Sequence, residues 1–153
     1  MKYRNVAWPE IETCVEAVGR ATRAAQFRPD CIVAILKGGM VPARLLSDFF
    51  GSIEIYPIRV KAYAGTRKLS RVRLEPFRYP IGRKNVLLVD DIHDSGRTLQ
   101  KVMRHLRRRR PRALRTATLF YKHIAQHAPD FQACTVAPDV WVVFPWEKSE
   151  MSR

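Results

Sequence analysis

The amino-acid sequence predicts an α/β fold in which a mostly parallel central sheet is flanked by helices. Two mainly apolar runs, Cys31–Leu36 and Asn85–Asp90, are each followed by a short turn and an amphipathic segment. Runs of this kind are typical of strands buried on both faces of a parallel sheet. Two further β-rich runs, Arg115–Lys122 and Asp139–Phe144, continue the alternation, and the length of 153 residues suits one domain over residues 1–153.

The first part of the chain supplies a helix and then a strand-turn-helix unit. Apolar side chains recur on one helical face over Trp8–Phe27, where Pro9 occupies the first turn and Pro29 follows the end. After the first buried strand, a second helical pattern covers Pro42–Phe50, and Ser52–Tyr63 is rich in β-forming residues. This order of elements indicates parallel strands joined across one face of a sheet.

The later elements place several turns at one edge of the sheet. Residues from about 62 to 78 are basic and poor in apolar side chains, which indicates a long mobile loop or a hairpin. The second buried strand leads through Asp94–Gly96 into another amphipathic helix. Ligands in such sheets lie beyond the carboxyl ends of the strands, so the following loops should converge on one cleft. The loops concerned follow Leu36, Val89, Tyr121 and Phe144.

The charge of the chain indicates an anionic partner. Lysine and arginine number 28 against 14 acidic residues, for a formal charge of +14. Nucleic acid, an acidic membrane surface and a polyphosphate metabolite all suit such a field. The apolar runs are too short to span a membrane and the first residues lack a signal-peptide core, so we expect a cytoplasmic protein with no membrane partner. The cysteines Cys14, Cys31 and Cys134 are predicted to be buried free thiols, because their spacing supports neither a zinc site nor a disulfide framework.

The turn after the second buried strand carries the strongest chemical signal. The strand ends in two adjacent acids, Asp90 and Asp91, and a helix begins a few residues later. Unpaired backbone N–H groups at a helix N-terminus bind phosphate, and paired carboxylates suit sugar hydroxyls or Mg²⁺. The turn between them consists of Asp94, Ser95, Gly96, Arg97 and Thr98. The alternative is an ordinary helix cap after a strand, with a solvated acidic turn.

This stretch resembles the signature of the type I phosphoribosyltransferase family, in which a hydrophobic strand and two acids precede a Thr-Gly-x-Thr-like turn. The resemblance implies that Asp94–Thr98 binds the 5-phosphate of phosphoribosyl pyrophosphate (PRPP), and that Asp90 and Asp91 bind the ribose hydroxyls. Leu36–Gly39 looks like the pyrophosphate loop of the hypoxanthine-guanine enzymes, where the peptide before the first glycine can be cis. It implies that Lys37 and Gly38 bind pyrophosphate; by itself, Lys-Gly-Gly could be an ordinary turn.

Two further segments resemble the 6-oxopurine branch of the family. Leu119–Lys122 is similar to the strand end at which a lysine donates to O6 of the base. Residues 141–147, within a base-binding segment at about 139–148, look like the Trp-Ile-x-x-Pro-Trp-Asp segment of the xanthine-guanine enzymes. On this resemblance Trp141 stacks on the purine, the backbone of Val142 reads its edge, and Glu147 joins Asp90 and Asp91 in holding Mg²⁺. Considered alone, Trp141 could belong to the core and Lys122 could be a solvated charge.

The chain also departs from the family pattern at three places. Ser95 replaces the usual threonine and keeps the hydroxyl, whereas Glu147 replaces aspartate and lengthens the carboxylate arm. The pair at 62–63 lacks the serine that many relatives carry before tyrosine in the mobile loop. The resemblance implies that this loop closes over the cleft.

The resemblance implies a phosphoribosyltransferase fold with a small hood over the base, and a purine-salvage enzyme of the hypoxanthine-guanine or xanthine-guanine type. Such an enzyme joins the 5-phosphoribosyl group of PRPP to guanine, hypoxanthine or xanthine, with Asp94 accepting the N7 proton and Mg²⁺ as cofactor. It implies a homodimer or homotetramer, for which Phe50 or Phe77 could supply exposed contacts. The alternatives are a nucleic-acid-binding regulator on the same fold, favoured by the basic charge, and an adenine or pyrimidine phosphoribosyltransferase.

Overall fold

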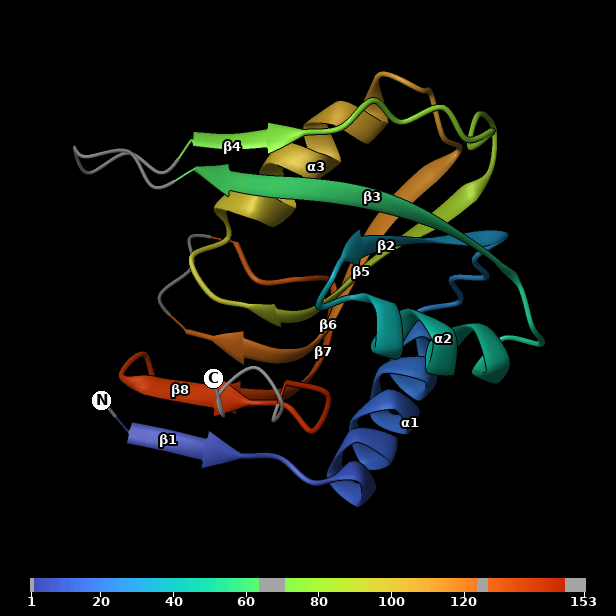
Figure 1. Ribbon diagram of the computed structural model, residues 1–153. Helices are drawn as coiled ribbons and strands as arrows, with labels where there is room; N and C mark the ends of the chain where they lie inside the picture. Colours follow the sequence, from blue (N-terminus) through green and yellow to red (C-terminus); the bar gives the residue numbers. More distant parts are fainter. Residues whose placement is uncertain (1, 64–70, 124–126, 148–153) are drawn as a thin grey trace.

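A six-stranded sheet with the order β4-β3-β2-β5-β6-β7 forms the centre of the computed structural model, which describes residues 2–63, 71–123 and 127–147 (Figure 1). The elements are β1 (Lys2–Asn5), α1 (Trp8–Ala24), β2 (Cys31–Leu36), α2 (Met40–Phe49), β3 (Glu54–Tyr63), β4 (Arg71–Leu74), β5 (Asn85–His93), α3 (Arg97–Arg107), β6 (Ala113–Lys122), β7 (Phe131–Val136) and β8 (Val140–Val143). All neighbours from β3 to β7 pair in parallel, and β3 and β4 pair antiparallel. The predicted α/β class and mostly parallel sheet are confirmed.

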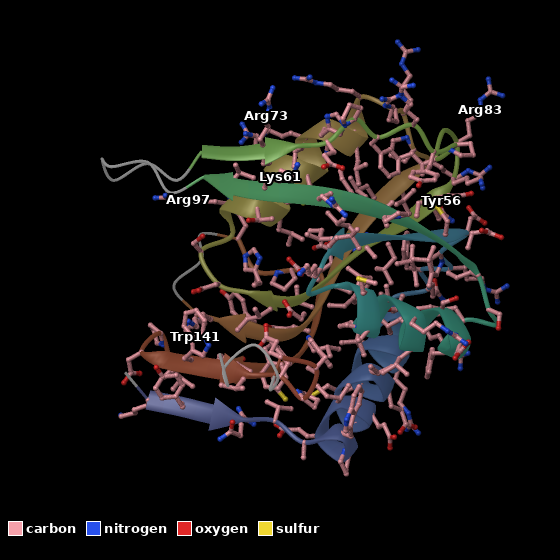
Figure 2. The ribbon with its side chains drawn as sticks, in the orientation of Figure 1. Tyr56, Lys61, Arg73, Arg83, Arg97 and Trp141 are labelled. Carbon is pink, nitrogen blue, oxygen red and sulfur yellow. The ribbon has the colours of Figure 1, made fainter. Side chains whose placement is uncertain are left out.

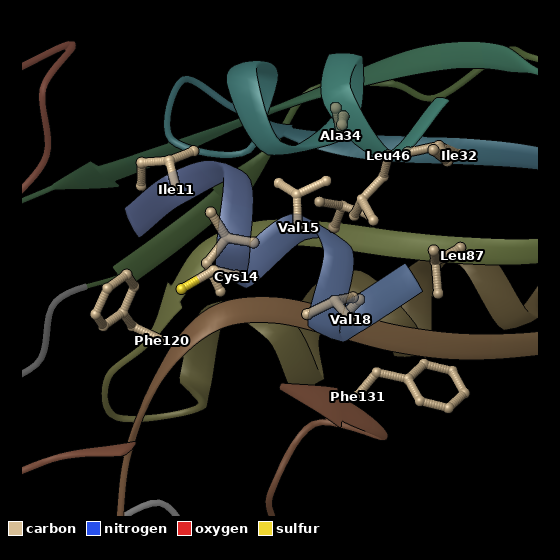
Figure 3. Packing of buried hydrophobic residues seen from close by; sticks show 14 of the residues in the cluster. Ile11, Cys14, Val15, Val18, Ile32, Ala34, Leu46, Leu87, Phe120 and Phe131 are labelled. Atoms are coloured by element: carbon tan, nitrogen blue, oxygen red, sulfur yellow. The ribbon is translucent and has the colours of Figure 1, made fainter. Parts of the chain in front are cut away.

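Helices cover both faces of the sheet, as the sequence predicts. Helices α1 and α2 lie on one face, where Ile11, Val18 and Leu46 pack against Leu87 and Phe131 (Figure 3). Helix α3 covers the other face. It packs its apolar side chains onto the central strands through a second cluster that includes Val33, Leu88, Val102, Leu106 and Phe77. The central strands are apolar throughout because both of their faces are buried.

The segment Asp139–Phe144 does not belong to the central sheet, which corrects the sequence prediction. Its strand, β8, pairs in parallel with β1 at the N-terminus and forms a separate two-stranded sheet (Figure 1). The edge of the central sheet is instead β7, paired with β6. The two-stranded sheet rests on the main body through Val142 and Phe144, both buried in the α1-side core. It corresponds to the small hood that the family resemblance implies.

The segment predicted as a loop or hairpin over residues 62–78 is a hairpin in its described parts. Strands β3 and β4 pair in the register Val60↔Leu74. Residues 64–70, between the strands, lie outside the described residues. The chain after β4 is anchored, because Phe77 is 1% exposed and packs in the α3-side core. Phe77 is therefore not the exposed oligomer contact that was predicted.

Smaller differences concern boundaries and cysteines. Helix α1 ends at Ala24, ahead of the predicted Phe27, because Gln26 turns the backbone into the left-handed region at φ 55°. The three cysteines are free thiols, as predicted, but Cys134 is only partly buried, and its Sγ lies 3.3 Å from Sγ of buried Cys14. In the described part of the chain, no helix is long and apolar enough to cross a membrane.

Candidate active site

Several strands end at the same edge of the central sheet, on the left in Figure 1, and the loop after β2 packs directly onto β5 there. A Cβ atom on Gly38 would lie 2.5 Å from Oδ2 of Asp91, and one on Gly39 would lie 2.4 Å from the carbonyl oxygen of Val89. No side chain fits into such spaces, so both glycines are required by close approach. The bond Leu36–Lys37 is cis. The resemblance implies a cis bond directly before Gly38, so the observed cis bond lies one peptide earlier.

The turn from β5 into α3 has the geometry of an anion site. Gly96 precedes α3 at φ 80°, a conformation that favours glycine, and no side chain caps the first turn of the helix. The N–H groups of that turn are consequently available to a ligand. A cavity of about 80 Å³ opens here, lined by residues that include Asp90, Asp94, Ser95, Gly96 and Thr98. Arg97, the first residue of α3, is exposed beside it.

The two acids at the end of β5 lie in a setting that disfavours their negative charge. Burial raises the pKa of Asp91 to about 6, although its Oδ1 accepts a hydrogen bond from Ile92 N at 2.7 Å, and the charge of Glu147 raises it further. Burial, and then the charge of Asp91, raise the pKa of Asp90 well above its ordinary value. Two adjacent carboxylates held in this way provide a site for a cation or for donor hydroxyl groups.

The end of β6 reaches the same site through an ion pair. Nζ of Lys122 lies 3.3 Å from Oδ1 of Asp94; the lysine side chain is 8% exposed and the aspartate side chain 56%. Lys122 is therefore not the solvated strand-end charge of the alternative interpretation. Instead, a nearly buried ammonium group is directed at the exposed carboxylate of the phosphate turn.

The hood contributes an aromatic surface at this edge. Trp141 on β8 is 49% exposed, so it is not a core residue, whereas its neighbour Val142 is buried. Figure 2 places Trp141 and Arg97 on the same side of the molecule, where β5 and β6 end. Just beyond β8, Oε2 of Glu147 accepts a hydrogen bond from Phe144 N at 3.1 Å. The negative charge of Glu147 is one of the causes that raise the pKa of Asp91.

One residue of this region was not found from the sequence. His93, the last residue of β5, is 3% exposed, and its ring lies 5.7 Å from that of Tyr121, nearly parallel to it. Burial lowers the pKa of His93, against a hydrogen bond to the backbone of His127. A single histidine in an apolar strand gives no sequence signal of such a position. The sequence also gives no sign of the close approach of Gly39 to Val89.

Comparison with known proteins identifies the family of this chain. The family model described as "Phosphoribosyl transferase domain" matches residues 8–150. The chain belongs to this phosphoribosyltransferase family. It is 32% identical to the xanthine-guanine phosphoribosyltransferase of Gluconobacter oxydans, over 97% of this chain and 87% of that protein.

Solved structures of other phosphoribosyltransferases have the same fold. The purine phosphoribosyltransferase of Pyrococcus horikoshii superimposes with a TM-score of 0.85 and 28% identity, covering 95% of both chains. The xanthine-guanine-hypoxanthine phosphoribosyltransferase of Helicobacter pylori superimposes with a TM-score of 0.82 and 26% identity, covering 99% of both chains. The family resemblance and the fold implied by it are confirmed.

Proposed function

We propose that this phosphoribosyltransferase transfers the 5-phosphoribosyl group of PRPP to a 6-oxopurine and releases pyrophosphate and a nucleoside 5'-monophosphate. The observation that carries the proposal is the buried Lys122 ammonium group beside Asp94, at the edge where Trp141 is exposed. A cation, a carboxylate and an aromatic face are the groups that a flat heterocycle with an oxo group and an acidic N–H requires. The names of the relatives, which are enzymes acting on purines, support the same substrate class.

PRPP would be held by three groups of residues. Its 5-phosphate would lie on the turn of Ser95, Gly96 and Thr98, at the uncapped N-terminus of α3. The ribose hydroxyls would donate to Asp90 and Asp91, and the pyrophosphate would lie along the loop of Lys37 and Gly38, which packs against Asp91. In this arrangement C1 of the ribose would lie between the pyrophosphate loop and the base.

The base would bind between Trp141 and the Lys122–Asp94 pair. Lys122 would donate to the 6-oxo group, the Val142 backbone would meet the purine edge, and the Asp94 carboxylate would accept the N7 proton as N9 bonds to C1. Negative charge on the leaving pyrophosphate would be met by Lys37 and by backbone N–H groups. Adenine presents an amino group at position 6, and a donor facing a donor typically leaves one hydrogen bond unmade, at a cost of about 1–3 kcal/mol.

The proposal includes a magnesium ion that the protein would hold together with PRPP. The described residues include no cluster of three side chains able to hold a metal by themselves. Asp90 and Asp91 do offer two adjacent carboxylates, and burial together with neighbouring negative charge raises the pKa of both. Mg²⁺ commonly binds through one or two carboxylates together with substrate phosphates, so these residues suit an ion shared with PRPP, with Glu147 near the same ion. When bound, Mg²⁺ would stabilise the charge of the departing pyrophosphate.

The test is turnover with separate bases. Purified protein with Mg²⁺ and PRPP should form nucleotide with guanine, hypoxanthine or xanthine, and adenine should react about tenfold to a hundredfold less efficiently. Lys122→Ala should raise KM for the oxopurine far more than KM for PRPP. Lys61→Ala is a matched control, because Lys61 is an exposed strand lysine paired with Glu75. Turnover with adenine or a pyrimidine alone would overturn the proposal.

The remaining inferences from the family are proposals of the same kind. We infer a cytoplasmic homodimer or homotetramer from the family resemblance, and light scattering of the purified protein would test the assembly. The nucleic-acid-binding regulator has no support among the relatives, which are named as enzymes. Absence of turnover with every base, together with tight PRPP binding, would favour the regulator instead.

A further inference from the structure

A second cavity lies behind the phosphate turn and plays no part in the mechanism above. It has a volume of about 550 Å³ and is lined by one side of α3, by β6, and by the segment just before β7. His93 and Leu99 line both this cavity and the small cavity of the phosphate turn. The two cavities therefore adjoin at a wall formed by these two side chains. Small-molecule sites in proteins commonly have volumes of about 300–1,000 Å³.

The charge of this cavity is positive. Arg104 and Arg107 lie three residues apart on α3, so both guanidinium groups project from the same side of the helix into its lining. Neither has an ion-pair partner among residues 2–63, 71–123 and 127–147. The guanidinium group matches the geometry of a phosphate, so two neighbouring arginines without a carboxylate partner can bind one.

The one carboxylate in the lining does not neutralise these arginines. Oδ2 of Asp130 accepts hydrogen bonds from N and Oγ1 of Thr116, at 2.8 and 3.0 Å. Its Oδ1 lies 3.7 Å from Nη1 of Arg115, which is not among the residues that line the cavity. Asp130 is thus occupied in fixing the start of β7 against β6. The charge of the two arginines remains available to a ligand.

The rest of the lining suits an organic group larger than a phosphate. Leu99, Met103 and Ala128 provide apolar surface, and Gln100 places an amide one turn before Arg104. A flat base could contact the apolar side chains while the amide reads its edge. A phosphate monoester carries close to two negative charges, which matches the two guanidinium groups.

We propose that this cavity is a second binding site, distinct from the substrate site, for a nucleoside 5'-monophosphate. The phosphate would bind Arg104 and Arg107, and the base would lie against Met103 and Ala128 beside Gln100. Such a ligand would touch the wall formed by His93 and Leu99. The site does not depend on which base the enzyme uses as its substrate.

The experiment is calorimetric titration of GMP into the whole protein saturated with Mg²⁺ and PRPP, so that the phosphate turn is already filled. One GMP should bind per chain. Guanosine should not bind, and inorganic phosphate should bind at least about tenfold more weakly, because each lacks half of the contacts. No GMP binding under these conditions, or equal affinities for GMP and inorganic phosphate, would overturn the proposal.

Matched variants locate the site. Arg104→Glu and Arg107→Glu should each weaken this GMP binding about tenfold or more, since a charge that attracts phosphate becomes one that repels it. Arg108→Glu is the control, because Arg108 is the exposed cap residue of the same helix and does not line the cavity. All three arginines are exposed, so circular dichroism should show an unchanged fold. Equal loss of GMP binding in the control would assign the binding to general charge and contradict the proposal.

Discussion

Asp94 is the side chain whose catalytic role can be tested most clearly without disturbing the fold. It is exposed, and its carboxylate pairs with Lys122. We predict that Asp94→Asn keeps the fold and PRPP binding but lowers kcat by about 10²- to 10⁴-fold, the usual contribution of a positioned general base. Steady-state kinetics and PRPP titration of the same preparation would measure both quantities.

The control for this prediction is Asp48→Asn, because Asp48 is also exposed and paired, with Arg44 on α2. Its kcat should equal that of the unmodified enzyme. A normal kcat in Asp94→Asn would remove Asp94 from the chemistry and leave it only as the partner of Lys122.

Asp91 lies near the same strand end, and its charged form lowers the stability of the folded protein. Its pKa is about 6 in the folded protein against an ordinary value of 3.8. Between these values the folded carboxyl holds a proton that the unfolded chain has released, so stability falls as pH rises through this window. Above pH 6 the full penalty is present, on the order of 2–3 kcal/mol.

We therefore predict that Asp91→Asn raises the free energy of unfolding at pH 7.5 by about 1–3 kcal/mol while it weakens PRPP binding. The gain should shrink towards zero near pH 4, where the native carboxyl is neutral. Urea unfolding in magnesium-free buffer at several pH values would measure it. A gain that is constant with pH would show that the charge of Asp91 is not its cause.

The two-glycine loop after β2 fixes the distance between β2 and β5 at the site. A Cβ on Gly39 would lie 2.4 Å from Val89 O and 2.7 Å from Ile35 O, both of which are backbone atoms that cannot rotate away. We predict that Gly39→Ala destabilises the fold by about 2–4 kcal/mol, in the range of overpacked buried positions. Thermal unfolding would measure the change.

Gly82→Ala is the matched control for this loop. A Cβ on Gly82 would lie 3.4 Å from Arg109 O, close to ordinary contact, so its melting temperature should change little. Equal melting temperatures for Gly39→Ala and the unmodified protein would mean that β2 and β5 can separate at this point.

The strands differ in how well the sequence alone predicts them. Strands β2 and β5 were found because burial on both faces makes their sequences almost entirely apolar. Strand β1 has four polar or aromatic residues and most of them are exposed, so it has no apolar pattern to detect. Strand β7 alternates poorly, because only Phe131 and Val136 at its ends are buried. Both segments form strands because each pairs with another strand, β1 with β8 and β7 with β6.

The candidate site was predicted for a different reason. Resemblance to the motifs of the family, together with their spacing, indicated Lys37, Asp90, Asp94, Lys122 and Trp141, and the structure brings these residues to one edge of the sheet. The same spacing could not show that Lys122 is nearly buried against Asp94, or that Gly38 touches Asp91. Such contacts depend on how far each loop folds back over its strand. They are visible only after the elements are assembled.

The charge of the whole molecule bears on the one substrate that is strongly anionic. With a formal charge of +14, the chain attracts PRPP over a range set by the ionic strength, whereas a neutral purine feels little of this field. Charges near the edge where the strands end, at the candidate site, should have the largest effect on the attraction of PRPP. Arg73 lies on the side where β3 ends, and Arg83 lies on the opposite side of the molecule (Figure 2).

We predict that kcat/KM for PRPP falls about tenfold between roughly 0.05 and 0.5 M salt, with KM for the purine nearly constant. At low salt, Arg73→Glu should lower kcat/KM for PRPP more than Arg83→Glu, although both change the net charge by the same amount. At high salt the two variants should converge, because the Debye length is then only about 4 Å. Equal effects at low salt would show that the total charge, and not its position near the site, guides PRPP to the enzyme.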